Sequence, residues 1–426
     1  MNTGSMSEKT ACDVAVIGGG AAGMMAALQA AWAGARVALL EKNEKLGKKI
    51  YITGKGRCNV TNVADIEDFF KQIPRNPRFL NAAARQFTHE DVTGLLDMLG
   101  TPTKVERGGR VFPESDKASD VTRALDRGMR DAGVVISLNT EVAHVKPAER
   151  GFDIALTQGG VLRAGSVIVA TGGVSYPSTG STGDGYRFAK ENGLNVTKLG
   201  ASLVGMTVDE KWCMLLQGLS LKNVRVTAKA GKKTIYSELG EMLFTHFGVS
   251  GPLIIELSSH MPEDYSQVSV TLDMKPGLTD EQVDLRLQRD FAENNRKQIS
   301  SVLTGLMPAR MAPVFAKLCG VDTDTPISQV TREQRMAIGH ALKALPLHVI
   351  GTRPIEEAIV TRGGVDVLEI TPGTMMSKKV PGLFFAGEVL DVDAHTGGFN
   401  LQIAFSTGAL AGKSAAAWAM DHQASC

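Results

Sequence analysis

The chain has 426 residues, of which 43% are apolar and 21% are charged, and its formal net charge is +1. This length suits two or three domains with sizeable cores, and the near-neutral charge excludes a global field that would attract nucleic acid or a membrane, although not a local basic patch. The five cysteines (Cys12, Cys58, Cys213, Cys319 and Cys426) are scattered, and none has metal-ligand spacing. We therefore expect a cytoplasmic globular protein without a metal site.

An uncharged run at residues 14–35 is long enough to suggest a membrane span. However, four glycines interrupt its first half, Asp13 immediately precedes it, and the preceding segment lacks the positive excess of a secretory signal. A buried strand, a tight turn and a buried helix explain the run better, so we expect no association with a membrane.

The first predicted elements form a β-α-β unit. Residues 13–17 are a short apolar strand, residues 18–20 are a glycine turn, and residues 21–34 are an Ala/Met/Leu-rich helix followed by a second strand at residues 36–40. Such crossovers imply a parallel sheet.

The pattern up to residue 195 then predicts three helices and a group of strands. The helices are expected at residues 77–87, 89–100 and 117–132. Short antiparallel strands are expected at residues 140–145, 152–156 and 161–163, with a turn at residues 158–160, and a buried strand at residues 166–170.

The texture of the sequence changes between residues 196 and 353. Strand-like runs at residues 224–228 and 268–272 lie beside polar helical stretches at residues 281–294 and 332–345, and no glycine fingerprint occurs there. After Pro354 the α/β texture returns, with a strand at residues 382–386 and a helix at residues 401–420. The simplest interpretation is one nucleotide-binding domain split by an insert.

The segment Gly18-Gly19-Gly20-Ala21-Ala22-Gly23 satisfies the G-x-G-x-x-G pattern of dinucleotide-binding folds. It follows a predicted strand and opens a helix, and Glu41 stands at the end of the second strand, which is the context that the pattern requires. Gly18 permits the tight turn, Gly20 lets the backbone approach a pyrophosphate, and Gly23 lets helix and strand pack closely. The helix N-terminus presents N–H groups to phosphate, while Glu41 can accept both ribose hydroxyls and would repel the 2′-phosphate of NADP.

Segments far along the chain favour FAD over NAD at this site. An apolar strand at residues 380–386 runs into Gly387-Glu388, an arrangement that many flavoproteins use to hold the ribityl chain. Residues 396–400 (Thr-Gly-Gly-Phe-Asn) lead into a long helix whose N-terminus could face the flavin N1/O2 edge. Thr171-Gly172-Gly173 matches the turn of flavoproteins with two dinucleotide sites.

The sequence resembles a specific group, the BaiN/YhiN-type flavoproteins, which include aminoacetone oxidase-like members. The most specific motif is residues 53–62 (Thr-Gly-Lys-Gly-Arg-Cys-Asn-Val-Thr-Asn), and further motifs lie at residues 244–252 and 387–391. The resemblance covers essentially the whole chain. It implies an α/β Rossmann-type FAD-binding domain at residues 11–195 and 355–422, interrupted by a mostly-β insert at residues 196–354 with a small helical subdomain at about residues 279–345.

The resemblance also implies that Val142 meets the adenine through its backbone and that Arg57, Asn59 and Thr61 lie along the cofactor. The motifs and the resemblance together place the following residues at FAD: Gly18, Gly20, Ala21, Ala22, Gly23, Glu41, Lys42, Lys49, Gly56, Arg57, Cys58, Asn59, Thr61, Val142, Ala170, Thr171, Gly172, Gly387, Glu388, Gly398, Phe399, Asn400 and Leu401.

Three residues are candidates for catalysis. Cys58 follows Arg57, whose guanidinium would lower the thiol pKa, so Cys58 is either a proton donor or redox thiol, or a small residue that packs the loop. His246 in the insert and His395 beside the Gly397-Gly398 turn are rival acid–base groups near neutral pH, and each has a purely structural alternative.

Two groups of basic residues invite functional interpretations. Lys48, Lys49, Lys55 and Arg57 form a run that either supplies countercharge to the pyrophosphate or is a solvated loop. In the insert, positive charge is concentrated on a strand-turn segment, which suggests either an exposed edge strand guarded by lysines or a contact with RNA phosphates. The basic residues of this segment are Lys222, Arg225, Lys229, Lys232 and Lys233.

These observations favour an FAD-dependent oxidoreductase that exchanges a hydride between flavin N5 and a substrate in the cleft between the FAD domain and the insert. No second fingerprint exists, so NAD(P)H would dock transiently as the electron donor. By family analogy the substrate is a steroid-like enone, an amine oxidised with O₂, or a uracil base of ribosomal RNA that is reduced to dihydrouridine. A small molecule and ribosomal RNA therefore both stay open as partners, as does a redox sensor without turnover.

Overall fold

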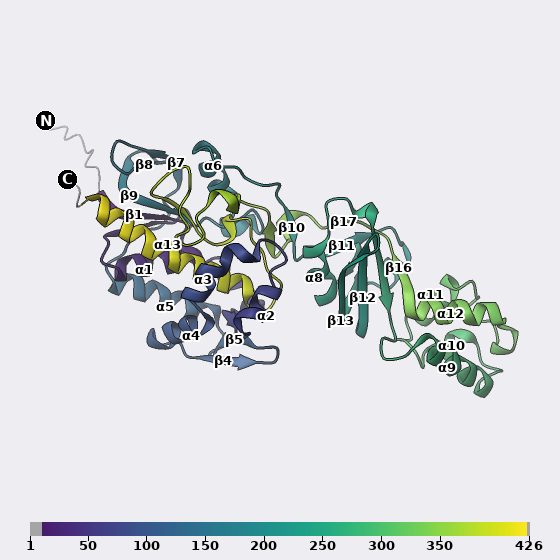
Figure 1. Cartoon of the computed structure of the whole chain (residues 1–426). Helices are drawn as coiled ribbons and strands as arrows, with labels where there is room; N and C mark the ends of the chain where they lie inside the picture. Colours follow the sequence, from purple (N-terminus) through teal and green to yellow (C-terminus); the bar gives the residue numbers. More distant parts are fainter. Residues whose placement is uncertain (1–10, 424–426) are drawn as a thin grey trace. The chain divides into compact units, whose positions relative to one another are not determined.

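The computed structural model describes residues 11–423 and separates into two compact units. The split unit combines the described residues up to Gly200 with those from Ile355 onward, and the inserted unit is Ala201–Pro354 (Figure 1). Each unit has its own cluster of buried apolar side chains.

The split unit is built on a seven-stranded sheet. Its parallel strands follow the order β6-β2-β1-β9, with antiparallel β8 and β7 beyond β9. The strands are β1 (Ala11–Ile17), β2 (Val37–Leu40), β6 (Val135–Ser137), β7 (Val142–Pro147), β8 (Phe152–Leu156), β9 (Val161–Val169) and β19 (Leu383–Phe385). The expected β-α-β start and α/β class are confirmed, with α1 (Ala21–Trp32) between β1 and β2.

One expectation for this sheet is wrong: residues 161–163 and 166–170 are not separate strands. They belong to the single strand β9, whose first half pairs with β8 and whose second half pairs with β19, while β1 follows it on the other side. Gly165 lies between the two predicted strands and is a point of close packing, where a Cβ would lie 3.0 Å from the Asp13 carbonyl oxygen and 3.2 Å from Ala419 Cβ.

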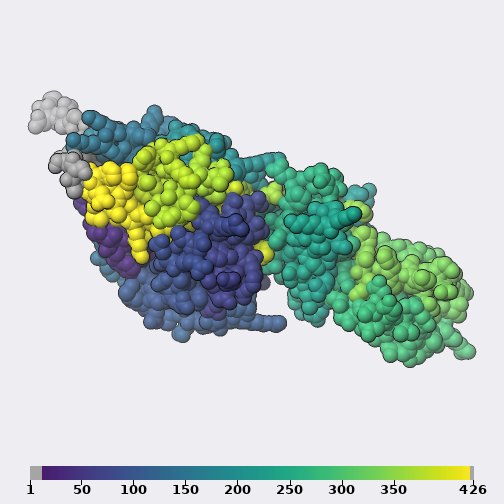
Figure 2. All heavy atoms as spheres, in the orientation of Figure 1, coloured from purple at the N-terminus to yellow at the C-terminus, as the bar shows by residue number. Residues whose placement is uncertain are grey.

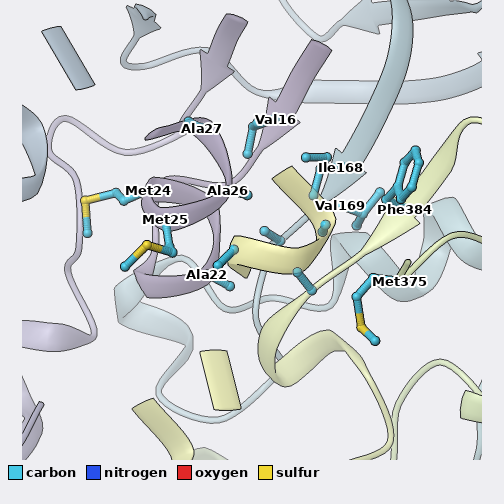
Figure 3. Close-up of a cluster of buried hydrophobic side chains, with 14 of the residues drawn as sticks. Val16, Ala22, Met24, Met25, Ala26, Ala27, Ile168, Val169, Met375 and Phe384 are labelled. Atoms are coloured by element: carbon cyan, nitrogen blue, oxygen red, sulfur yellow. The ribbon is translucent and has the colours of Figure 1, made fainter. Parts of the chain in front are cut away.

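Two buried helices cover the split unit beside the sheet. Helix α1 carries no charged residue, and the long helix α13 (Phe399–Gln423) packs along it. Figure 3 shows side chains of α1 with Val16 of β1, Ile168 and Val169 of β9, and Phe384 of β19. In the space-filling view the last residues of the split unit, in yellow, lie beside the first ones, in purple (Figure 2). The cofactor unit predicted from both ends of the sequence is therefore physically continuous.

The remaining elements of the split unit surround this core. Helix α5 begins after Lys117 and packs against α1. A small sheet of order β3-β5-β4 begins with the last two residues of the 53–62 segment. The elements are β3 (Thr61–Asn62), α2 (Ile66–Lys71), α3 (Asn81–Gln86), α4 (His89–Met98), β4 (Thr103–Glu106), β5 (Arg110–Pro113), α5 (Ala118–Asp131), α6 (Asp184–Glu191), β10 (Gly200–Ser202, which extends into the other unit) and β18 (Val360–Arg362).

The inserted unit is an antiparallel sheet of order β16-β15-β12-β13-β14-β11-β17. Its two outer strands are consecutive in the chain and only His348 separates them, so the sheet must curl until its edges meet. The His348 backbone N–H donates to the Glu210 carboxylate (2.9 and 3.0 Å), and the Asp209 N–H donates to the His348 carbonyl (2.9 Å). The strands are β11 (Met206–Val208), β12 (Ser220–Ala230), β13 (Lys233–Thr245), β14 (Gly248–Ser250), β15 (Val268–Asp273), β16 (Leu345–Leu347) and β17 (Val349–Thr352).

The helices of this unit include a group between β15 and β16. Thr279 and Thr331 form capping boxes that begin its two longest helices, because each hydroxyl accepts from the backbone three residues on. The helices are α7 (Trp212–Leu215), α8 (Pro252–His260), α9 (Asp280–Glu293), α10 (Ile299–Leu303), α11 (Ala312–Leu318) and α12 (Arg332–Ala344).

The basic segment of the inserted unit is not on an edge strand, which corrects one interpretation of the sequence. Strand β12 lies between β13 and β15 and is paired on both sides. Lys229, Lys232 and Lys233 are exposed around the β12–β13 turn.

Among residues 11–423, no helix combines the length and the apolar character that a membrane crossing requires.

Candidate functional site

A deep cavity lies within the split unit, where β1, β2 and β9 end. It encloses about 1310 Å³ of empty space, part of which is open to solvent. This is the edge at which doubly wound sheets bind ligands. Fourteen of the residues predicted at FAD line it: Gly18, Gly20, Ala21, Ala22, Glu41, Lys42, Lys49, Val142, Ala170, Thr171, Gly172, Glu388, Asn400 and Leu401.

The glycine fingerprint shapes the inner wall of the cavity. A Cβ on Gly18 would lie 2.5 Å from the Ala170 carbonyl oxygen, and a Cβ on Gly23 would lie 1.8 Å from the Gly18 carbonyl oxygen. By contrast, a Cβ on Gly20 would meet nothing within 4 Å. The backbone is therefore closed toward the sheet and open at the residue where a pyrophosphate has to approach.

The first turn of α1 is prepared for an anion. Gly20 is its N-cap, no side chain caps the helix, and its first turn carries no acidic residue. The N–H groups of Ala21 and Ala22 therefore meet no side-chain cap and no carboxylate from the first turn of their own helix.

Glu41 occupies the end of β2 and is held in place by the backbone. Its Oε2 accepts from the Gly19 N–H (2.7 Å), and its Oε1 accepts from the N–H and the side-chain amide of Asn43 (2.8 and 2.6 Å). The carboxylate is buried yet lines the cavity, so it suits the sugar hydroxyls of an AMP half.

Glu388 is held by four hydrogen bonds from three residues. Its two oxygens accept from Lys49 Nζ (2.9 and 2.7 Å), and Oε1 also accepts from Ser175 Oγ (2.9 Å) and the Thr361 N–H (2.8 Å). Lys49 is thus bound to a carboxylate, and Lys48 likewise pairs with Glu44 (2.9 Å). These ion pairs weaken the interpretation of the basic run as free countercharge for phosphate.

The 53–62 segment lies beside the cavity, and only Thr53 of it lines the wall. Gly54, Lys55, Gly56 and Cys58 all have positive φ angles, so the loop is tightly coiled. The Thr61 hydroxyl donates to the Gln402 side chain of α13 (2.5 Å), which joins the segment to the end of the chain.

Two side chains of this loop differ from expectation. The Arg57 guanidinium pairs with Glu106 and with Asp116 (2.6 Å) and stacks on the Phe112 ring. Burial raises the pKa of the Cys58 thiol to about 12, and a hydrogen bond to Thr53 lowers it less. The expectation that Arg57 lowers this pKa is therefore wrong, because the guanidinium is committed to two carboxylates and the thiol is fully buried.

The two candidate histidines lie in different units. His395 is half-buried in the split unit, where its N–H donates to the Gln72 carbonyl (2.9 Å) and its Nδ1 lies 3.1 Å from Gln72 Oε1. The Asn400 side chain holds the same loop by bonding Ala394 and His395. His246 is exposed on the inserted unit and meets the Phe247 ring edge-on.

Nine other predicted positions lie outside the cavity lining. Gly387 is anchored from behind, because its N–H donates to Thr407 Oγ1 (3.0 Å), and Gly398 is pressed against Thr61, whose carbonyl oxygen would lie 2.3 Å from a Cβ there. Their roles at the cofactor stay predictions. They are Gly23, Gly56, Arg57, Cys58, Asn59, Thr61, Gly387, Gly398 and Phe399.

Sequence reasoning missed part of the wall. Thr179, Gly180 and Ser181 line the cavity from the loop before α6, and Asp184 lines it from the first turn of that helix. The repeated Ser-Thr-Gly of residues 178–183 was the available signal. Ile359 and Val360 also line it, but no local pattern marks them.

The polar atoms of the site test whether FAD fits. Thr171 Oγ1 on the wall and Asn59 Oδ1 in the 53–62 segment are buried and have no hydrogen-bond partner in the described part of the chain. Buried polar atoms of this kind require a partner. With the uncapped helix and Glu41, these residues fit a long, polar cofactor with phosphates in its middle. Within residues 11–423, no cluster of three or more His, Cys, Asp or Glu side chains could hold a metal ion.

Comparison with known proteins agrees with this geometry. The family described as "HI0933-like protein Rossmann domain" matches residues 12–414. The chain is 32% identical to a 3-dehydro-bile acid delta(4,6)-reductase of Clostridium scindens, over 95% of this chain and 98% of the relative. It is 33% identical to a protein of Escherichia coli K12 named ribosomal RNA dihydrouridine synthase, over 93% and 96%.

A solved structure shares the fold. A flavocytochrome c3 fumarate reductase in its open conformation superposes with a TM-score of 0.52 at 18% identity, covering 97% of this chain and 79% of that one. The family match confirms the resemblance carried by the 53–62 motif. The chain therefore belongs to the HI0933-like Rossmann family and is an FAD-dependent oxidoreductase.

Proposed function

We propose that this protein reduces a carbon–carbon double bond conjugated to a carbonyl group in a small molecule, with NAD(P)H as a transient electron donor. The observation that carries the proposal is the relative from Clostridium scindens, which matches nearly end to end and is named a delta(4,6)-reductase of a 3-dehydro-bile acid. A double bond at position 4 is conjugated to an oxo group at position 3.

When bound, FAD supplies a carrier that takes a hydride from a donor and passes it to a substrate. The split unit holds that carrier. The uncapped turn of α1 binds the pyrophosphate, Glu41 binds the ribose of the AMP half, and Glu388 binds the ribityl chain. FAD would fill the resident site and the sequence carries no second glycine fingerprint, so the nicotinamide donor docks elsewhere and transiently.

Reduction of a conjugated double bond also requires a proton, and we propose His395 as its source. Its loop is fixed from two sides, by Gln72 and by Asn400, and Asn400 lines the cavity. A donor held on an anchored loop suits proton delivery better than the exposed His246 does.

The test is anaerobic mixing of the holoenzyme with NADH or NADPH while flavin absorbance is followed. The reduced protein is then mixed with 4-androstene-3,17-dione, with uridine, with a ribosomal RNA transcript, or with O₂. We expect bleaching by a nicotinamide and the fastest reoxidation by the enone. Reoxidation by O₂ alone would contradict the proposal. Reoxidation by RNA alone would move the protein to the uridine-reducing reaction, since uridine has the same conjugated unit.

The histidines are separated in the same experiment. We expect His395→Asn to leave bleaching by the donor unchanged and to slow reoxidation by the enone at least tenfold, with loss of the pH dependence of that step. His246→Asn is the matched variant on the inserted unit and should leave both steps near wild type. The reverse result would show that His246, and not His395, is the proton donor.

A further inference from the structure

The residues around Glu388 form a hydrogen-bonded network that no sequence motif predicted. Lys49 Nζ donates to Ser175 Oγ (2.7 Å), and Ser175 Oγ donates in turn to Glu388 Oε1 (2.9 Å). Ser175 and Thr361 have no solvent exposure. Glu388 Oε1 accepts three of the four hydrogen bonds, and Oε2 accepts one, from Lys49. Oε2 thus keeps acceptor capacity on a side chain that lines the cavity.

Thr361 is the residue that holds two parts of this network together. Its N–H donates to Glu388 Oε1 (2.8 Å), while its Oγ1 accepts from the N–H groups of Val174 (2.9 Å) and Ser175 (3.1 Å). A Cβ on Gly173 would lie only 2.2 Å from Thr361 Oγ1. The hydroxyl therefore packs tightly against the turn at residues 171–175, which carries Thr171 and Gly172 at the cavity wall.

The position of Thr361 in the chain links its contact with Glu388 to the strand that returns from the inserted unit. It lies on β18, a few residues after the split unit resumes at Ile355, and the two residues before it, Ile359 and Val360, line the cavity. The strand by which the chain returns from the inserted unit is thus itself part of the cofactor wall.

We propose that Thr361 and Ser175 are positioning residues that aim Glu388 Oε2 at a hydroxyl of the ribityl chain and couple FAD retention to the order of the return strand β18. The proposal does not depend on the identity of the substrate. It predicts that the hydroxyl of Thr361 matters for the cofactor although Thr361 does not line the cavity.

The test compares Thr361→Val with Thr361→Ser in the holoenzyme. Valine has nearly the same volume but leaves two buried N–H groups without an acceptor, whereas serine keeps the oxygen. We expect Thr361→Val to release FAD on dilution about tenfold faster, or more, and to exchange the amide hydrogens of residues 358–363 faster. Thr361→Ser should restore both values to within about threefold of wild type, a margin set by context-dependent packing.

Ser175→Ala and Ser166→Ala form a matched pair of buried serines. Ser166 donates to the Asp13 and Ala415 carbonyls and lies outside the cavity lining. We expect Ser175→Ala to speed FAD release and to shift the flavin midpoint potential, and Ser166→Ala to do neither. Equal FAD release by Thr361→Val and wild type would overturn the proposal, and so would a Thr361→Ser protein as impaired as Thr361→Val, since shape rather than the hydroxyl would then be what matters.

Discussion

Gly408 of α13 lies directly against Ala22 in the first turn of α1. A Cβ on Gly408 would be 2.4 Å from the Ala22 carbonyl oxygen, and one turn later a Cβ on Gly412 would be 2.3 Å from that of Ala26. Because Ala22 also lines the cavity, the last helix of the chain sets the position of the turn that receives the phosphates.

Gly408→Ala should therefore weaken both the fold and the cofactor site. The added methyl has backbone on the other side and cannot be accommodated without moving α1, so we expect a loss of about 1–3 kcal/mol in the free energy of unfolding together with faster FAD release. Chemical denaturation and flavin fluorescence measure the two effects. Gly94→Ala in α4 is the matched control, since a Cβ there meets nothing within 4 Å, and it should stabilise by about 0.5–1 kcal/mol. Equal effects of the two substitutions would show that the helix contact is not tight.

Glu41→Gln should weaken the retention of FAD. The substitution removes an acceptor for sugar hydroxyls and disturbs the bond from the Gly19 N–H, so FAD release should become about tenfold faster. Asp68→Asn, whose partner Lys71 is exposed and which lies outside the cavity lining, is the control and should release FAD at the wild-type rate. Unchanged release in Glu41→Gln would remove this carboxylate from the site.

The Cys58 thiol should stay protonated and unreactive near neutral pH. Its pKa is raised to about 12 by burial, so it stays protonated in the folded protein while an unfolded thiol ionises above about pH 9. The unfolded state then binds fewer protons than the folded state, and the free energy of unfolding should fall as pH rises from about 9 toward 12. Cys58→Ala should reduce that slope by about 1.4 kcal/mol per pH unit.

A thiol reagent at pH 8 checks the same point directly. Cys426 lies outside the described residues, so the Cys426→Ser protein is the proper background. The remaining thiols (Cys12, Cys58, Cys213 and Cys319) all have pKa values raised by burial, so we expect no rapid labelling before denaturation. Rapid labelling of Cys58 would revive its interpretation as a reactive thiol.

Arg57 should act on the loop rather than on the cofactor. Its bonds to Glu106 and Asp116 and its stacking on Phe112 hold a coiled segment whose tip, Lys55, is exposed. We expect Arg57→Gln to speed tryptic cleavage after Lys55 about fivefold, the effect of losing a modest surface network, with FAD release changed less than twofold by the same estimate. Arg163→Gln, which removes the exposed pair with Asp153, should leave this cleavage unchanged.

Local patterns predicted the elements that local chemistry determines. The fingerprint predicted β1, α1 and β2 because glycines, an uncharged helix and Glu41 stand in one short stretch. Strand β8 was expected at residues 152–156 and lies there, since a glycine turn bounds it. The β9 strand was divided wrongly, because its continuity depends on pairing with β1, β8 and β19, which come from other parts of the chain.

Contacts between residues that are far apart in the chain could not be predicted from local sequence patterns. Ser175, Thr361 and Glu388 are separated by 186 and 27 positions, and nothing near any of them announces the other two. The same holds for the closure of the inserted sheet, which depends on β16 and β17 reaching opposite edges. The expected effect of Arg57 on the Cys58 pKa was wrong for a related reason, because the Arg57 partners Glu106 and Asp116 come from β4 and the loop after β5.

The division of the cofactor wall between the two ends of the chain has a consequence for synthesis on the ribosome. Glu388, Asn400 and Leu401 emerge only after all of residues 201–354 have been translated. Until then, the apolar side chains of β1 and α1 that pack against α13 stay exposed. A nascent chain that stops early lacks Glu388 and the helix that seats the phosphates. Retention of the yellow cofactor thus reports that translation has run through to the final helix.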